Sequence, residues 1–324
     1  MRNERKNIGT GASADTGKSA AKGKRKISLL RALMVSLAVI VLIQGALPIS
    51  VLAFSGLKGT LEGNAISIDA RAVDNRKVNL ESAMLKGWAG ISRETAALNS
   101  TLSDQLARSG LDVPGFLADD AQKEAFIAAV FPRLLSVIGS NTTSGVYLIL
   151  GNDGDLSVEQ DHIGAFLRDS DPNSSSDSYS DLLLERGDKE LARNTSIALD
   201  NTWAPKLHLA GNGMRSADDF FYKPYEAALQ NPGVEAKALA YWSQPFVLEG
   251  NPNDSYRMIA YSLPLMYEGR VYGVLGIEVS TAYLADTCFP ISELSGSEAG
   301  GYALALANDD GSYQIIAGNG ALYN

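Results

Sequence analysis

The longest uninterrupted apolar stretch in the sequence covers residues 32–54, which contain no charged side chain. A helix of that length spans about 35 Å at about 1.5 Å per residue, which is enough to cross a hydrocarbon core of about 30 Å. We therefore expect residues 32–54 to form a transmembrane helix in contact with the lipid bilayer. A cleaved signal peptide is the alternative, with Val51-Leu52-Ala53 as its cleavage site. The apolar run is longer than the signal core of roughly 7–15 residues that such peptides carry, and this favours an uncleaved anchor.

Apolar residues then recur at helical spacing as far as Leu106. The stripe consists of Ile66, Val73, Leu80, Met84, Trp88, Ile91, Leu98, Leu102 and Leu106, most of them three, four or seven positions apart. This pattern predicts a helix of about forty residues, within a long stalk segment that we assign to residues 55–110. Gly87 and Gly90 each weaken that helix by about 1 kcal/mol, so packing must hold it. Two interpretations stay open: the stripe packs on its own domain, or part of it forms the seam of a homodimer.

Beyond residue 110 the pattern changes from long helix to alternating helices and strands. Helical patterns cover residues 121–138 and 219–229. Strand patterns cover residues 145–150, 163–168, 238–246, 257–266 and 271–280, and a turn containing glycine joins the last two strands. This order predicts an α+β fold with an antiparallel five-stranded sheet, and not a doubly wound parallel sheet.

Two further strand patterns, at residues 300–308 and 312–317, flank the turn Asp309-Asp310-Gly311. A single hairpin is marginally stable in water. We therefore expect residues 291–324 to be the start of a second, smaller module that the chain truncates, and the whole chain to be the N-terminal part of a longer protein.

Charge is distributed unevenly along the chain. Residues 1–31 carry nine basic and two acidic residues, a formal charge of +7, and the remainder carries −16, which together give the net charge of −9. Basic flanks of membrane helices stay in the cytoplasm, so we expect a disordered cytoplasmic tail at residues 1–31, with residues 55–324 outside the cell membrane. The acidic exported part argues against nucleic-acid binding, which needs a basic surface.

Several chemistries are excluded by residue counts. Cys288 is the single cysteine, so there is no disulfide framework, and one cysteine with His162 and His208 does not supply a typical zinc site. We predict no metal and no cofactor. No nucleophile–histidine or metalloprotease motif is present, so the sequence assigns no catalytic residue.

Four segments carry a resemblance to a known family. Residues 241–246 (YWSQPF), 259–265 (IAYSLPL) and 271–280 (VYGVLGIEVS) resemble the closing strands of a double Cache sensor domain, and residues 220–228 (FFYKPYEAA) resemble its aromatic helix segment. The resemblance covers residues 55–324 and includes the long helix after a membrane anchor. It implies two stacked PAS-like modules outside the membrane of a bacterial receptor.

The resemblance also implies an organisation and a mechanism. It places the ligand in a membrane-distal module, residues 111–290, and implies a cytoplasmic effector downstream, of histidine kinase, diguanylate cyclase or chemoreceptor type. Tyr222 stands where amino-acid-binding members have Arg, Pro224 replaces their Trp, and Glu278 stands where they have Asp. An α-carboxylate ligand would therefore lack its usual guanidinium clamp.

Strand parity selects candidate ligand-binding residues within this module. Side chains alternate along a strand, so Tyr241 and Ser243 share one face, Tyr261 shares a face with Ile259, and Glu278 shares a face with Tyr272. Tyrosines, a serine and a carboxylate on a concave face suit a small polar ligand. The candidates are Tyr222, Tyr225, Tyr241, Ser243, Tyr261, Glu278 and Arg168. Among them, Arg168 is a candidate anion clamp, and the two helix tyrosines, Tyr222 and Tyr225, would close the site from above. For each, the alternative is a structural role as a core tyrosine, a surface aromatic or a local ion-pair partner.

Together these features predict the extracytoplasmic small-molecule sensing region of a membrane-anchored signal-transduction receptor. Its ligand would shift the stalk helices within a homodimer and so control an effector that this chain does not contain. The alternatives are a membrane-tethered surface hydrolase, because acidic residues are plentiful, and a plain binding module without signalling output.

Overall fold

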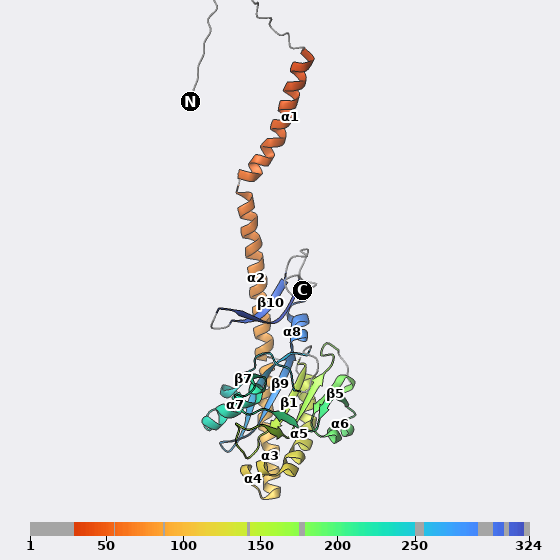
Figure 1. Cartoon of the computed structure of the whole chain (residues 1–324), viewed down its shortest axis with the longest axis vertical. Coiled ribbons are helices and arrows are strands. Elements are labelled where there is room, and N and C mark those ends of the chain that lie inside the picture. The colour runs from red at the N-terminus through yellow and green to blue at the C-terminus, as the bar shows by residue number, and fades with distance from the viewer. Residues whose placement is uncertain are drawn as a thin grey trace, which may run out of the picture. The chain divides into compact units, whose positions relative to one another are not determined.

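The computed structural model describes residues 29–54, 56–86, 88–140, 143–174, 179–249, 256–290, 301–307 and 311–320 (Figure 1). The predicted basic tail lies outside the described residues as far as residue 28. The chain divides into two compact units, residues 1–70 and 71–324.

The first unit contains α1 (Leu29–Phe54) and the beginning of α2 (Leu57–Lys86). Within α1, Leu33–Val51 is a window of 19 residues with a mean hydropathy of 2.2, none of it buried inside the protein. By length and composition this helix is able to cross a membrane, and a signal sequence near the N-terminus would have the same properties. Pro48 lies inside α1, and membrane helices tolerate a proline within the helix.

The prediction of one continuous helix between Ile66 and Leu106 is wrong. The helix α2 is followed by a 3₁₀ segment, η1 (Trp88–Arg93), and then by α3 (Glu94–Ser109). The 3₁₀ segment contains Gly90, one of the glycines that weaken the pattern, and it has 3.0 residues per turn in place of 3.6. Ile91 of η1 and Leu98 of α3 nevertheless lie in one core, where they are 0% and 1% exposed.

The second unit is built on one large sheet, with strand order β5-β4-β3-β1-β9-β8-β7. Its strands are β1 (Gly145–Leu150), β3 (Gly164–Asp169), β4 (Leu182–Arg186), β5 (Ala198–Ala204), β7 (Tyr241–Trp242), β8 (Met258–Tyr267) and β9 (Arg270–Ser280). All neighbouring pairs are antiparallel except β4 with β5. The predicted α+β class with a mainly antiparallel sheet is therefore confirmed, and the sheet has seven strands in place of the predicted five.

The smaller elements connect these strands and cover the sheet. The helices are α4 (Val113–Ala118), α5 (Asp120–Ser140), α6 (Lys189–Thr195), α7 (Asp219–Gln230) and α8 (Thr281–Cys288); the short 3₁₀ segments are η2 (Tyr179–Asp181), η3 (Ser216–Asp218) and η4 (Ala236–Leu239); and β2 (Gln160–His162) pairs with β6 (Leu207–Leu209). The predicted helices at 121–138 and 219–229 are confirmed as α5 and α7. The predicted strand at 238–246 shrinks to the two residues of β7, preceded by η4.

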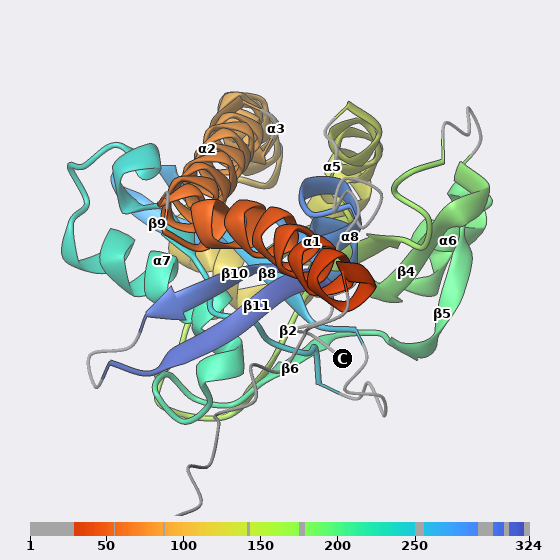
Figure 2. The ribbon, with the colours of Figure 1, turned by 90° about the horizontal axis from the view of Figure 1, so that it is seen from above.

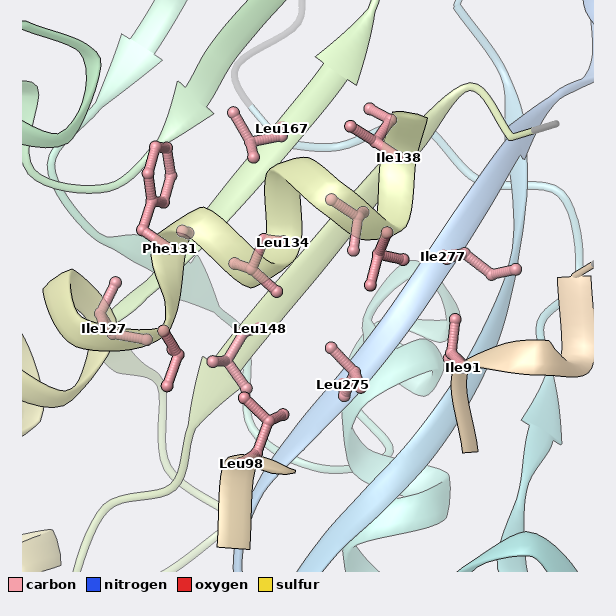
Figure 3. Packing of buried hydrophobic residues seen from close by; sticks show 14 of the residues in the cluster. Ile91, Leu98, Ile127, Phe131, Leu134, Ile138, Leu148, Leu167, Leu275 and Ile277 are labelled. Carbon is pink, nitrogen blue, oxygen red and sulfur yellow. The ribbon is translucent and has the colours of Figure 1, made fainter. Parts of the chain in front are cut away.

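The two faces of the sheet bury separate hydrophobic clusters. We call the face that packs against α3 and α5 the α5 face; its residues include Leu148, Leu167 and Leu275, all fully buried (Figure 3). We call the opposite face the α7 face, where Tyr147 and Phe166 stack beneath α7 and β6. Figure 2 shows α3 and α5 on one side of the sheet and β6 on the other. The α5 face therefore forms a continuous hydrophobic core, which leaves the α7 face as the place for polar side chains.

The second unit also contains a separate two-stranded sheet, β10 (Gly301–Ala307) with β11 (Tyr313–Gly320), as predicted for this part of the sequence. Asn319 of β11 donates to the carbonyl oxygens of Ala285 and Phe289, at 3.1 and 2.8 Å, at the end of α8. Arg76 of α2 donates to the Cys288 carbonyl oxygen at 2.5 Å, and its guanidinium carbon lies 5.0 Å from the ring centre of Tyr302 in β10. The two strands are thus tied both to α8 and to α2.

Candidate functional site

Two of the predicted site residues, Arg168 and Glu278, lie in the same row across the sheet. Gly145 of β1 pairs with Arg168 on one side and with Glu278 on the other. A Cβ atom on Gly145 would lie 2.5 Å from Glu278 Oε1 and 2.8 Å from its Cγ. The absence of a side chain at position 145 therefore gives the Glu278 carboxyl the space it occupies between the strands that carry the two residues.

Arg168 is the only cation in a group that we call the charged cluster, which consists of Arg168, Glu185, Asp200, Tyr256 and Glu278. The Arg168 guanidinium forms ion pairs with Glu185, at 3.0 Å, and with Asp200, and its carbon lies 4.4 Å from the ring centre of Tyr256. The two acidic partners come from β4 and β5, and their side chains are 2% and 3% exposed. A stacked, paired guanidinium of this kind is held in one orientation.

Glu278 is fully buried, at 0% exposure. Burial raises its pKa to about 8, although the hydrogen bond from Tyr256 and the charge of Arg168 oppose that rise. Burial also raises the pKa of Glu185, against the influence of Arg168. One guanidinium thus faces three carboxyl groups, and the low dielectric favours keeping a proton on at least one of them.

Two carboxyl oxygens in the charged cluster have unused hydrogen-bonding capacity. Oε2 of Glu185 and Oε2 of Glu278 are both buried without a hydrogen-bond partner among the described residues. Buried polar atoms are nearly always paired, because an unmade hydrogen bond costs about 1–3 kcal/mol. Such atoms in the midst of fixed charges are candidates for contact with a ligand.

Tyr256 lies over Arg168 and closes the charged cluster. Its hydroxyl donates to Glu278 Oε1 at 2.9 Å while its ring stacks on the Arg168 guanidinium. Burial and the neighbouring Glu278 raise the pKa of the Tyr256 hydroxyl, so it stays a donor. The side chain is itself half-buried, and it separates Glu278 from solvent.

The predicted tyrosines of α7 lie on the same side of the sheet, apart from the charged cluster. Tyr222 packs edge-on against Phe221 with a ring separation of 5.2 Å, and burial raises its pKa to about 12. Tyr225 stacks on Phe221 and reaches Gly151 at the end of β1, where a Cβ atom would meet the tyrosine hydroxyl at 2.2 Å. Tyr225 also lines a cavity of about 590 Å³ beside the turn between β8 and β9.

Tyr241 and Ser243 lie at the edge of the sheet. Tyr241 pairs with Ser262 of β8 and is half-buried, and burial raises the pKa of its hydroxyl. The Ser243 hydroxyl accepts the backbone N–H of Ala260 at 2.8 Å. The structure therefore uses Ser243 to extend the pairing of the edge strand.

Tyr261 lies on the opposite face of the sheet from Glu278. Its ring packs against that of Trp242 at a tilt of 42°, with the ring centres 4.9 Å apart, within the cluster of the α5 face. Because Tyr241 pairs with Ser262, the residue after Tyr261, the two tyrosines point to opposite faces. The predicted sharing of a face by Tyr272 and Glu278 is also wrong, because an irregularity between β8 and β9 turns Tyr272 toward α3, where its hydroxyl donates to Asn99 at 2.8 Å.

Three members of the charged cluster were not predicted: Glu185, Asp200 and Tyr256. The signal in the sequence is the pair Glu185-Arg186 at the end of an otherwise leucine-rich strand, since a charged residue that ends a buried strand needs a partner. Within the described residues, no group of three or more His, Cys, Asp or Glu side chains could hold a metal ion.

No protein-family model and no curated protein matches the sequence. The solved structures that are similar to the chain include three sensor proteins. The methyl-accepting chemotaxis protein X has 13% identity and a TM-score of 0.36, covering 78% of this chain and 75% of that one. The extracellular domains of the putative histidine kinases soHK1S-Z6 and mmHK1S-Z3 have 16% and 13% identity and TM-scores of 0.31 and 0.28, covering 78% and 74% of this chain and 73% and 69% of theirs. These are proteins of two kinds that the sequence resemblance names; at TM-scores below 0.5 the likeness assigns no function to this chain.

Proposed function

We propose that residues 55–324 are the extracytoplasmic small-molecule sensing region of a membrane-anchored signal-transduction receptor. The anchor is α1, and the basic residues before it keep the N-terminus in the cytoplasm. The effector lies outside this chain.

One observation carries the proposal: the charged cluster contains a fully buried glutamate whose second oxygen has no partner among the described residues. A carboxyl group that serves stability alone would have both oxygens paired or would be replaced by an apolar residue. Here three acidic residues and one arginine are held in place on a rigid sheet. The arrangement is suited to recognising a polar molecule.

The chemistry of the free atoms favours a ligand that donates hydrogen bonds. A carboxylate only accepts hydrogen bonds, so Glu185 Oε2, and Glu278 Oε2 once Glu278 gives up its proton, call for an amine or another N–H or O–H donor. A protonated amine would also supply the positive charge that the three carboxyl groups lack beside Arg168. The ligand enters where the Tyr256 side chain now lies, and it replaces the hydrogen bond from Tyr256 to Glu278.

Ligand binding at the charged cluster is coupled to α2 through contacts within residues 71–324. Glu278 lies near the end of β9, which continues directly into α8, and the end of α8 contacts Arg76 of α2. A ligand that favours one arrangement of the cluster would therefore favour one position of α2. In a homodimer this change would be transmitted along the stalk.

The proposal is tested by a thermal-unfolding screen of the full chain in nanodiscs against amines, amino acids, organic acids and sugars. We expect at least one amine-bearing compound to raise the melting temperature in a saturable way. The same compound should give no shift in Glu278→Gln, which keeps the shape of the residue but cannot become a carboxylate when an amine binds. It should give a normal shift in the control Glu235→Gln, whose side chain is exposed.

Turnover separates the proposal from the hydrolase alternative. The stabilising compound should be recovered unchanged after prolonged incubation with the protein. Chemical conversion that depends on Glu278 would assign the charged cluster to an enzyme. Stabilisation that persists in Glu278→Gln would remove the charged cluster from the ligand site.

A further inference from the structure

A second polar cavity lies beside β6, apart from the charged cluster. Its volume is about 240 Å³, and its walls come from the ends of β4 and β5, from β6, from the residues around η3 and from Leu248 and Glu249. None of the five residues of the charged cluster lines it. It is large enough for a ligand of a few heavy atoms.

Three cationic side chains from separate segments line this cavity: Arg186, Lys206 and Arg215. Two acidic side chains, Asp218 and Glu249, also line it. The formal charge of the lining is therefore +1 with His208 neutral. Protonation of His208, whose pKa is raised by its hydrogen bonds to Asp161 and Glu159, would add to that positive charge.

Both acidic residues of the lining are already occupied by one cation. Arg215 contacts the Asp218 carboxylate through Nε at 3.0 Å and through a terminal nitrogen at 2.9 Å, and it contacts Glu249 at 2.8 Å. These bonds leave Arg186 and Lys206 without an acidic partner from the wall of the cavity. Lys206 instead pairs at 3.0 Å with Asp120, which is more than half exposed.

Arg186 is the unusual member of this group, because it is 5% exposed and forms no ion pair with an acidic side chain of the described residues. Its guanidinium donates to three backbone carbonyl oxygens, those of Glu185 and Thr202, both at 2.8 Å, and that of Glu249. It forms no ion pair with a carboxylate in the part of the chain that the structure describes. Burial lowers its pKa, although Glu185, Asp200 and Glu249 nearby oppose this.

A buried guanidinium has five N–H donors, and the carbonyl oxygens use three of them. The remaining donors lie on a residue that lines the cavity, as do the unused donors of the Lys206 ammonium. An oxyanion in the cavity would accept these hydrogen bonds and would supply the negative charge that Arg186 lacks. Arginine suits carboxylate and phosphate groups because its planar fork matches two oxygens at once.

We propose that this cavity is a binding site for a small oxyanion, of the carboxylate or phosphate class, held by Arg186 and Lys206. The site is separate from the charged cluster, and it has the opposite charge preference. A receptor with both sites responds to an anion independently of the ligand at Glu278.

The test uses the full chain in nanodiscs, titrated separately with sodium phosphate and sodium succinate, with sodium chloride at matched ionic strength as reference. Calorimetry gives the dissociation constant, and the unfolding temperature gives an independent signal. We expect saturable binding of at least one of the two anions, and the anion that binds identifies the class. Binding by neither, or effects equal to those of sodium chloride, would overturn the proposal.

Three variants locate the site. Lys206→Gln removes a partly exposed cation and should weaken binding roughly tenfold, the loss expected for one charge-assisted hydrogen bond. Arg186→Gln should weaken it further; if that buried substitution prevents folding, Lys206→Gln decides. The matched control Arg193→Gln removes an exposed cation outside the cavity and should leave the dissociation constant unchanged.

Unchanged affinity in Lys206→Gln, or an equal loss in Arg193→Gln, would show that the anion binds elsewhere. Glu278→Gln should bind the anion as the wild type does. If no amine stabilises the protein but an anion binds as described, the proposed ligand site at Glu278 is refuted and the proposed anion site stands.

Discussion

Replacement of Glu278 by glutamine should make the folded protein less sensitive to alkaline pH. Burial raises the pKa of Glu278 to about 8 from its ordinary 4.5, so the folded state holds this proton more tightly than the unfolded state does. The stabilisation is complete below pH 4.5 and is lost as the pH rises through about 8. Since one pKa unit corresponds to about 1.4 kcal/mol, the loss between these limits is on the order of 4 kcal/mol.

Glutamine is neutral at every pH and resembles the protonated glutamic acid, so Glu278→Gln should differ from the wild type by less than about 1 kcal/mol at pH 5. At pH 8 the variant should be the more stable protein, by on the order of 4 kcal/mol. Asp169, whose pKa is raised to about 6 by burial, titrates in both proteins, and in the wild type its charge contributes to the raised pKa of Glu278.

Urea unfolding of the full chain in nanodiscs at pH 5, 6, 7 and 8 measures these differences. Tryptophan fluorescence reports the second unit, because all three tryptophans, Trp88, Trp203 and Trp242, lie in residues 71–324. Glu235→Gln, at an exposed position, is the control and should follow the wild type. Parallel pH profiles for the wild type and Glu278→Gln would refute the assignment of Glu278 as a buried, mainly protonated group.

Three other substitutions test separate features of the structure. Gly145→Ala should lower the free energy of unfolding by about 1–3 kcal/mol, because its Cβ would meet the Glu278 carboxyl at 2.5 Å; an unchanged urea midpoint would contradict that close approach. The hydrogen bonds to Asp161 and Glu159 raise the pKa of the His208 imidazole, so the folded protein should lose stability as the pH rises above 6.5. His208→Gln, made in the Glu278→Gln background, should remove this loss; a pKa of His208 at or below 6.5 in an NMR titration would count against it. Tyr261→Ala should cost about 3–5 kcal/mol of stability and leave ligand affinity intact, because the ring packs in the core of the α5 face; a selective loss of affinity would return Tyr261 to the ligand site.

Segments with a single strong period were predictable from the sequence. The strand β1 and the paired strands β8 and β9 are continuous apolar runs bounded by turn residues, and α5 and α7 carry clear helical patterns. These elements form the centre of the sheet and its covers. Whether each of these segments is a helix or a strand depends on its local hydrophobic pattern alone, and a single sequence contains that pattern.

The edge of the sheet was not predictable in the same way. The strand β5 has mostly polar or exposed positions, and its parallel pairing with β4 connects segments that no turn joins directly. Such a strand exists because a neighbouring strand presents unpaired backbone groups, and not because of its own hydrophobic pattern. Likewise, the two-residue β7 depends on the side chain of Ser243 for part of its pairing.

The candidate site was predictable only in part for a related reason. Glu278 was found from strand parity and family resemblance, and Arg168 from its place at the end of a strand before an acidic loop, but their proximity depends on Gly145 standing between them. Glu185 and Asp200 join them through the pairing of three strands, a relation that a single sequence does not encode locally. The alternation of side chains along one strand shows which of its residues share a face. Which residues of two different strands share a face depends on the register in which the strands pair.

One side chain, Arg76, holds together segments that are 212 positions apart in the sequence. Its guanidinium binds the last carbonyl of α8 and also covers the aromatic ring of Tyr302. A sliding or twisting movement of α2 in this region must therefore carry the end of α8 and the β10 strand along with it, or else give up both contacts together. Arg76 therefore couples the movement of α2 to that of the segment that follows the large sheet.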